Sequence, residues 1–387
     1  MARKVDTICI VIRNSRPLEI KAPRMTEIPP LQEITVEITQ QCLQKCVHCS
    51  SVATIKSQKT LTKDEIIRIA QDFANLGGKT MELSGGEPLL HDEIFNLIPI
   101  LKSLKIRVNV FTCGKITDSN DFARILKEKA VVLKRQGVNK VVLSVHGANS
   151  QTHNDIARSQ NSFSHAVTFI QELVKENLPV GIHFVPMSPN FEEFKDLVEF
   201  AVRIGVKEIS VLRFVPQGRG EENKESLMLD KEAAARLIEL LTESEKRKDI
   251  RIKIGSHLDF TFLLDGAPPK KCMAGIRKCL VEPNGDVIPC AVFKGMKDKE
   301  NNNYVAGNVR ETSLDTIWRT SSLFKKFRTF DPKSLKGECA TCQYLSPCRG
   351  RCPAQRVYDY KDLFQGPDSY CPKELFQRRT SCAGDTQ

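Results

Sequence analysis

An alternation of strand-like and helix-like segments between residues 33 and 246 limits what this chain can fold into. The segments that predict strands are short, apolar and rich in β-branched residues, and they lie at 33–39, 79–84, 106–111, 139–145, 180–186 and 207–213. Amphipathic helices are predicted at 62–76, 91–104, 118–136, 162–177, 191–204 and 230–246. Strands that alternate with helices indicate a parallel α/β architecture. Six strand-helix units are too few for a closed eight-stranded barrel.

Three cysteines follow the first predicted strand directly. Cys42, Cys46 and Cys49 have the spacing CxxxCxxC and occupy the kind of loop that carries chemistry in parallel barrels. Cysteine thiolates are the usual ligands of iron-sulfur clusters, and a full protein set is four. Three thiolates would therefore leave one iron free to bind something else. A zinc site or buried thiols are the alternatives, although structural zinc usually takes four ligands from CxxC pairs.

A second motif, Gly85-Gly86-Glu87-Pro88, ends the second predicted strand. The paired glycines permit a close approach between backbone and ligand, and Glu87 can accept hydrogen bonds from a cationic amine. Alone, each motif is common. Together, and in this order along the chain, the two motifs are a specific signature of one kind of site.

With His48 in the aromatic place of CxxxCx(aromatic)C, the two motifs resemble those of the radical S-adenosylmethionine (radical SAM) enzymes. The resemblance implies a partial (β/α)6 TIM-like barrel, which the six predicted units match. It also implies a 4Fe-4S cluster on the three cysteines, whose open iron is chelated by S-adenosylmethionine. The contacts to that cofactor, carried over residue by residue, would come from His48, Gly85, Gly86, Glu87, Ser144, Arg158 and Leu212.

Eight further cysteines lie between residues 272 and 371. Eight thiolates suffice for two four-iron clusters, and the pattern CxxC-x5-CxxxC with an upstream pair resembles the SPASM extension of many radical SAM enzymes. By that resemblance, auxiliary cluster I takes Cys272, Cys279, Cys290 and Cys352, and auxiliary cluster II takes Cys339, Cys342, Cys348 and Cys371. Two zinc ribbons would also fit the count. Three cysteines receive no metal, namely Cys9, Cys113 and Cys382.

These motifs predict four regions. They are an extended arm at 1–32, the barrel at 33–217, a connecting helix and strand at 218–255, and a cysteine-rich SPASM domain at 256–387. The turn Glu282-Pro283-Asn284-Gly285 has the Asn-Gly signature of a β-hairpin, which would bring Cys279 and Cys290 together.

Charge and hydropathy exclude several classes of partner. Lysine and arginine number 58 against 47 acidic residues, a net charge of +11, but the basic residues are scattered and aromatic residues make up only 6%. We therefore expect no nucleic-acid partner. No apolar run is long enough to span a bilayer, and no signal peptide is evident at the N-terminus. The chain is predicted to be cytoplasmic, with reduced flavodoxin or ferredoxin as its electron donor.

The resemblance implies reductive cleavage of S-adenosylmethionine to a 5′-deoxyadenosyl radical, which abstracts hydrogen from a substrate. The cofactors would be S-adenosylmethionine and three 4Fe-4S clusters. A ribosomally made peptide, crosslinked or otherwise modified, is the favoured substrate, because that is the commonest use of this extension. Ala291 replaces the aspartate of sulfatase maturases and counts against formylglycine formation.

Two alternatives remain open at the level of sequence. An arm of about 30 residues cannot fold a leader-binding winged-helix domain, which keeps a small-molecule substrate such as a tetrapyrrole precursor in view. The alternative from a different class of function is a metal-binding module without catalytic activity. No catalytic acid or base can be named from the residues.

Overall fold

The computed structural model describes residues 28–265 and 269–373. The predicted extended segment at 7–12 in the arm, together with Cys9 and Cys382, lies outside the described residues. Within them, no helix is both long and apolar enough to cross a membrane.

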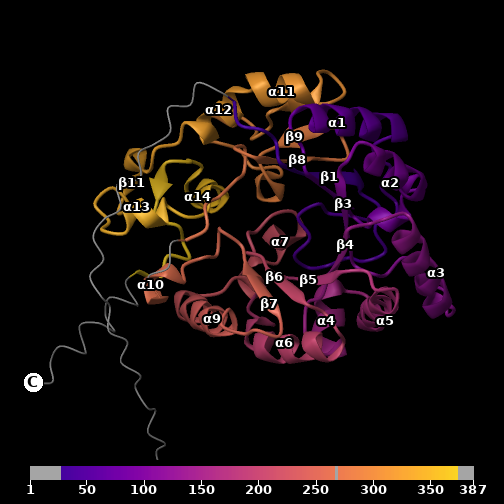
Figure 1. Cartoon of the computed structure of the whole chain (residues 1–387). Coiled ribbons are helices and arrows are strands. Elements are labelled where there is room, and N and C mark those ends of the chain that lie inside the picture. The colour runs from indigo at the N-terminus through magenta and orange to yellow at the C-terminus, as the bar shows by residue number, and fades with distance from the viewer. Residues whose placement is uncertain (1–27, 266–268, 374–387) are drawn as a thin grey trace, which may run out of the picture.

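A ten-stranded sheet forms the centre of the molecule, in the order β10-β9-β8-β1-β2-β3-β4-β5-β6-β7 (Figure 1). The first seven strands are parallel to their neighbours and run in chain order. Their bounds are β1 Glu33–Thr39, β2 Thr80–Gly85, β3 Arg107–Thr112, β4 Lys140–Ser144, β5 Val180–Phe184, β6 Glu208–Val211 and β7 Arg251–Ile254. All six predicted strands are present, and the predicted α/β partial barrel is confirmed.

Helices cover the outside of this curved sheet and form an arc around it (Figure 1). They are α1 Lys63–Asn75, α2 Ile94–Ser103, α3 Phe122–Arg135, α4 Ser150–Ala157, α5 Ser162–Lys175, α6 Phe194–Arg203 and α9 Lys231–Ser244. The first of them begins with a capping box, in which Thr62 and Glu65 each accept the other's backbone N–H.

The two faces of the sheet differ in polarity because strand side chains alternate. On β1, Ile34 and Val36 face the helices and are fully buried in the main core. The intervening Thr35 faces inward, where its hydroxyl donates to the Glu82 carboxylate at 2.5 Å, and Lys278 bonds the same carboxylate at 2.9 Å. The helices therefore rest on an apolar face, while the inside of the barrel is lined with charged groups.

The cysteine-rich region continues the same sheet. Its elements are β8 Lys278–Val281, β9 Asp286–Ile288, β10 Gly307–Asn308, a small pair of β11 Lys336–Gly337 and β12 Gln365–Gly366, and the helices α10 Phe262–Asp265, α11 Leu314–Thr320, α12 Ser322–Arg328, α13 Leu345–Cys348 and α14 Pro353–Tyr360. The predicted hairpin is confirmed as β8 and β9, which pair antiparallel, with Gly285 at φ +92° in the turn. Because β8 also pairs in parallel with β1, a backbone ladder crosses the predicted domain boundary.

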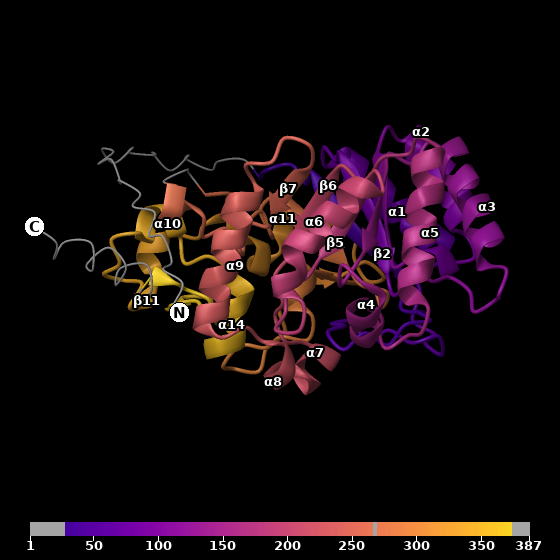
Figure 2. The same cartoon turned by 90° about the horizontal axis from the view of Figure 1, so that it is seen from below.

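Two short helices, α7 Arg219–Glu222 and α8 Lys224–Leu227, lie on the chain between the barrel and this region. Seen from below, α10 and β11 lie at the opposite end of the molecule from α2 and α3 (Figure 2).

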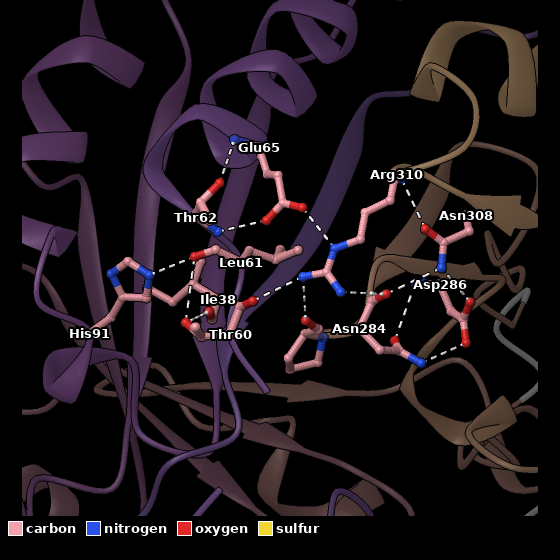
Figure 3. A network of polar contacts seen from close by, with 11 residues as sticks. Ile38, Thr60, Leu61, Thr62, Glu65, His91, Asn284, Asp286, Asn308 and Arg310 are labelled. Carbon is pink, nitrogen blue, oxygen red and sulfur yellow. Dashed lines mark hydrogen bonds and ion pairs between the residues drawn. The ribbon is translucent and has the colours of Figure 1, made fainter. Parts of the chain in front are cut away.

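Arg310 ties the hairpin turn to the start of α1 (Figure 3). Its guanidinium donates to the Glu65 carboxylate at 2.7 Å and to the backbone oxygens of Thr60 at 3.0 Å and Asn284 at 3.2 Å. Burial opposes ionisation of Glu65, but the bonds from Arg310 and Thr62 outweigh it and lower the pKa of that carboxyl. The cysteine-rich region is thus fixed to the barrel by side chains as well as by the sheet.

Candidate active site and cysteine groups

The cysteine loop and the Gly-Gly-Glu-Pro turn contact each other through their backbones. The N–H of Gly86 donates to the carbonyl of Thr39, and the N–H of Glu87 donates to the carbonyl of Gln41, both at 2.7 Å. A Cβ on Gly86 would lie 2.3 Å from the Gln41 oxygen, and one on Gly85 would lie 2.2 Å from the Thr39 oxygen. Only glycine allows this contact, so the two motifs that the sequence singled out form one structural unit.

The Glu87 side chain is fully buried and already has partners. Its carboxylate accepts hydrogen bonds from the Thr112 hydroxyl and the Cys113 N–H at 2.8 Å, and from the Leu89 N–H at 3.0 Å. Burial raises the pKa of this carboxyl although these donors oppose the shift. In the structure, Glu87 fastens the end of β3 to the turn, and its predicted contact with an amine stays a prediction.

Cys42, Cys46 and Cys49 lie close together on their loop. Burial and the neighbouring Cys49 and Cys42 thiols raise the pKa of Cys46. The unassigned Cys113 packs against Cys42 in the same small cluster. This donor set fits an iron-sulfur cluster held by three thiolates of one loop.

Arg219, at the start of α7, holds this loop in place. Its guanidinium donates to the carbonyl of Cys46 at 2.9 Å and to that of Ala53 at 3.1 Å, and its N–H donates to the carbonyl of Cys49 at 3.1 Å. Sequence reasoning missed Arg219, because no local pattern links a residue after β6 to a loop after β1.

The other predicted cofactor contacts lie around this loop or at the same edge of the sheet. His48 is edge-on to His146, with ring centroids 4.7 Å apart, and burial lowers its pKa to about 4. Its Nδ1 is buried without a hydrogen-bond partner in the described structure. Ser144 ends β4 and Leu212 follows β6, so both lie at the C-terminal edge of the parallel strands. Arg158 is exposed at the end of α4, with an Nη2 contact of 3.4 Å to Asn223.

The later cysteines form two groups. In one, burial together with Cys272 and Cys352 raises the pKa of Cys290. The other contains the four cysteines assigned to auxiliary cluster II, namely Cys339, Cys342, Cys348 and Cys371. Burial and the charges of neighbouring thiols in this group raise the pKa of Cys339, Cys348 and Cys371. Burial raises the pKa of the Cys279 thiol, and the charges of Lys278 and Arg328 oppose this shift; the place of Cys279 in auxiliary cluster I stays a prediction. In the described part of the chain no three His, Cys, Asp or Glu side chains form a ready site for a single ion.

A buried ion pair joins the end of β6 to the cysteine-rich region. The Arg213 guanidinium donates to both oxygens of Asp368 at 2.7 and 2.5 Å, and the two side chains are 0% and 2% exposed. The Tyr370 ring lies 4.0 Å from the guanidinium carbon. Asp368 also accepts the N–H of Cys352 at 3.2 Å, so the pair positions a predicted cluster ligand.

A second buried ion pair joins β1 to the cysteine-rich region. Lys294, four residues after Cys290, contacts the Glu37 carboxylate on β1 and donates to the Ser51 hydroxyl at 2.6 Å. Glu37 Oε2 is buried with no hydrogen-bond partner in the described structure. Neither buried pair was predicted from the sequence.

Two family models match this chain. The radical SAM superfamily model matches residues 36–201, and the SPASM iron-sulfur cluster-binding domain model matches residues 272–343. The chain is therefore a radical SAM enzyme with a C-terminal SPASM domain.

Among relatives, it is 28% identical over 370 residues to the AdoMet-dependent heme synthase of Methanosarcina barkeri, covering 90% of this chain and 97% of that protein. It is also 27% identical over 347 residues to the mycofactocin maturase MftC of Mycolicibacterium smegmatis, an alignment that covers 87% of this chain and 82% of that protein.

Solved structures share the fold. Streptococcus suis SuiB bound to S-adenosylmethionine aligns with a TM-score of 0.67 and 21% identity, covering 89% of this chain and 77% of SuiB. Native anSMEcpe with bound AdoMet aligns with a TM-score of 0.67 and 18% identity, covering 92% of this chain and 100% of anSMEcpe. At these identities the likeness concerns the fold alone.

Proposed function

We propose that this enzyme cleaves S-adenosylmethionine reductively at a cluster on Cys42, Cys46 and Cys49 and abstracts hydrogen from a substrate. The observation that supports the first part is the backbone contact between the cysteine loop and the Gly85-Gly86 turn. When bound, the cluster supplies one electron for cleavage of the sulfonium, and the difficult chemistry belongs to the cofactors.

The protein's contribution is position and exclusion of water. Arg219 fixes the cysteine loop through three hydrogen bonds, and the glycine turn sets the distance between that loop and β2. His48 is kept neutral by burial, which suits a contact with an uncharged ring. We assign the cofactor contacts to the seven residues predicted from the sequence.

The electron donor and the compartment are part of the same proposal. An acidic protein such as reduced flavodoxin or ferredoxin complements the net charge of +11. Every cysteine in the described ranges is free of disulfides, which suits the reducing cytoplasm.

A cavity of about 110 Å³ in the SPASM region is lined in part by Cys272 and Cys348, which the sequence assigns to the two auxiliary clusters. Every charged residue that lines this basic cavity is a lysine or an arginine, namely Lys270, Lys271, Lys326, Arg328, Arg349, Arg351 and Arg356. A cleft lined by one sign of charge concentrates ligands of the opposite sign. These basic residues therefore complement the negative charge of the thiolate-bound clusters that Cys272 and Cys348 are predicted to hold.

A ribosomally made peptide is our first candidate for that substrate. The relatives named MftC maturase and PqqA peptide cyclase, the latter 25% identical over 356 residues, support it. A carboxylate-bearing tetrapyrrole is the second candidate. It is favoured by the relative named heme synthase, 97% of whose length aligns with this chain.

The test of the activity uses anaerobically reconstituted enzyme reduced with dithionite in the presence of S-adenosylmethionine. We expect 5′-deoxyadenosine and methionine in equal amounts. Cys46→Ala should abolish both products while sparing the clusters of the SPASM domain, and Cys113→Ala, which removes the neighbouring unassigned thiol, should retain activity. Product formation by Cys46→Ala would contradict the assignment.

The two substrate classes are separated by which compound stimulates product formation. Porphyrins with several carboxylates should shift their Soret absorption on binding and increase 5′-deoxyadenosine if the tetrapyrrole candidate holds. A short open reading frame beside the gene, whose synthetic peptide gains a crosslink detectable by mass spectrometry, would instead support the peptide.

A further inference from the structure

A buried chain of hydrogen bonds, here called the relay, connects the cysteine loop to α4 and α5. The side-chain amide of Gln44 lies between Cys46 and Ser162, with Oε1 3.2 Å from the cysteine sulfur and Nε2 2.5 Å from the serine hydroxyl. His153 Nε2 lies 3.0 Å from the same hydroxyl, and the backbone N–H of His146 donates to His153 Nδ1 at 3.2 Å. The side chains of Gln44, Ser162 and His153 belong to residues that are 2%, 0% and 1% exposed, so bulk water does not reach the relay.

The direction of these hydrogen bonds is set from the His146 end. A backbone N–H can only donate, so His153 Nδ1 is an acceptor and carries no proton. Burial lowers the pKa of His153 to about 4, which keeps the ring neutral at neutral pH with its one proton on Nε2. This Nε2–H therefore donates to the Ser162 hydroxyl oxygen.

The Ser162 hydroxyl then has its own hydrogen to donate. In the described part of the chain, the side-chain amide of Gln44 is the only other hydrogen-bond partner of this hydroxyl. Buried polar groups are almost always hydrogen-bonded. The relay therefore favours the amide oxygen of Gln44 on the Ser162 side and the amide nitrogen on the Cys46 side.

The orientation in the structure, with Oε1 toward Cys46, suits a protonated thiol that donates to this oxygen. A cysteine that binds iron is a thiolate, which can only accept hydrogen bonds. Turning the amide over exchanges its oxygen and nitrogen in nearly the same space. The turned amide of Gln44 donates to the sulfur and accepts from Ser162, so every polar group of the relay has a partner.

The backbone around Gln44 supports the same role. The N–H of Gln44 already points at a second predicted ligand, since it donates to Cys42 Sγ at 3.4 Å. The N–H groups of Lys45 and Val47 donate to two carbonyls at the C-terminal end of α4, at 3.2 and 2.9 Å. This part of the loop is therefore fixed on both sides of Gln44.

We propose that Gln44 is a positioning residue that donates its side-chain N–H to the Cys46 sulfur in the cluster-loaded enzyme, held in that orientation by Ser162 and His153. Hydrogen bonds to the sulfurs help to set the reduction potential of a cluster. They raise it, because the reduced cluster carries more negative charge. The inference rests on the loop cluster of the proposed function and deepens it by naming a residue that makes this cluster easier to reduce. It does not depend on cleavage of S-adenosylmethionine.

The test is a redox titration of the anaerobically reconstituted full chain, followed by electron paramagnetic resonance. The signal of the loop cluster is the one lost when Cys42, Cys46 and Cys49 are all replaced by alanine. Gln44→Met keeps a side chain of similar length but removes the amide. Its loop cluster should be harder to reduce by a factor of about three to ten, which is a midpoint potential about 28–59 mV lower at 59 mV per tenfold change. An unchanged midpoint would overturn the proposal, and so would a higher one, because it would mean that the amide oxygen faces the sulfur.

Ser162→Ala tests the relay from outside the cysteine loop, and it decides the question if Gln44→Met loads no loop cluster. Without the hydroxyl, the amide oxygen of Gln44 loses its donor and both orientations of the amide become accessible. The midpoint potential should therefore fall in the same direction by a smaller amount. A wild-type midpoint in Ser162→Ala would refute the role of the relay.

The matched control is Gln40→Met. The Gln40 amide bonds the Ser51 carbonyl and the Ser57 hydroxyl in the same part of the chain, so this variant disturbs the packing of the loop but not the relay. Its midpoint potential should stay at the wild-type value. A shift as large as that of Gln44→Met would mean that loop packing alone sets the potential, and the proposal would fall.

The outcome is separate from that of the proposed function. If the expected shifts appeared in an enzyme that formed no 5′-deoxyadenosine, the proposed activity would fail and this inference would stand. If the wild type formed 5′-deoxyadenosine while Gln44→Met and Ser162→Ala kept its midpoint potential, the inference would fail and the activity would stand.

Discussion

The Arg213–Asp368 pair gives the sharpest stability prediction. Asp368→Asn removes the negative charge but keeps the shape, so the Arg213 guanidinium is left buried without a counter-charge. Removing one partner of a buried pair costs about 3–5 kcal/mol. With an unfolding entropy of about 2.1 cal/mol/K per residue, a chain of 387 residues should lose about 4–6 °C of melting temperature.

The assay is thermal unfolding of anaerobic, cluster-loaded protein followed by circular dichroism. Replacing Arg213 by Met in the same chain as Asp368→Asn should recover part of the loss, because it removes the stranded charge. The matched control is Glu128→Gln, which breaks an ion pair with Arg124 whose side chains are 61% and 58% exposed, and it should melt like the wild type. An Asp368→Asn protein that melts within about 1 °C of wild type would refute the reasoning.

Three further predictions follow from the contacts described. Gly86→Ala should reduce 5′-deoxyadenosine formation by about 100-fold or more while sparing the SPASM clusters, because its Cβ would meet a backbone oxygen at 2.3 Å; wild-type rates would contradict this. Burial raises the pKa of Glu282 to about 7. Its protonated form therefore stabilises the folded state, and this contribution is lost as pH rises from about 4.5 to 7. In urea unfolding, the free energy of unfolding of Glu282→Gln should increase by about 1–2 kcal/mol relative to that of wild type between pH 5 and pH 8. A pH-independent difference would argue against it. Arg310→Ala should cost about 1–2 kcal/mol in the same assay, and Arg310→Lys should restore little of it because lysine lacks the planar fork; full rescue by lysine would count against the role of the fork.

The strands and the enclosing helices could be predicted from the sequence because their patterns are local. The hairpin at Asn284-Gly285 is an example, since the turn chemistry alone specifies it. The predicted grouping of Cys352 with Cys272 and Cys290, in contrast, rests on the family resemblance and not on spacing. The face on which Cys279 lies could not be predicted. It depends on the register between β8 and β1, and a shift of one residue would turn the side chain to the opposite face.

The polar contacts around the site could not be predicted from the sequence either, because they join residues that are far apart in the chain. Arg213 and Asp368 are 155 positions apart, and Arg219 is 173 positions from Cys46. Such pairs arise only when the sheet closes, so no window of sequence contains both partners. Such residues are identified only from the folded structure, which shows which buried charged side chains form pairs.

The pairing of β1 with β8 has a consequence for synthesis on the ribosome. The first strand emerges early, but one of its two neighbours begins only at Lys278. At about 5–20 residues per second, the nascent chain carries an unpaired edge next to the Cys42 loop for about 10–50 s. Such edges invite pairing with other chains. Translation of the C-terminal region is thus what completes the N-terminal strand, and a message truncated before residue 278 would leave the cysteine loop on an open edge.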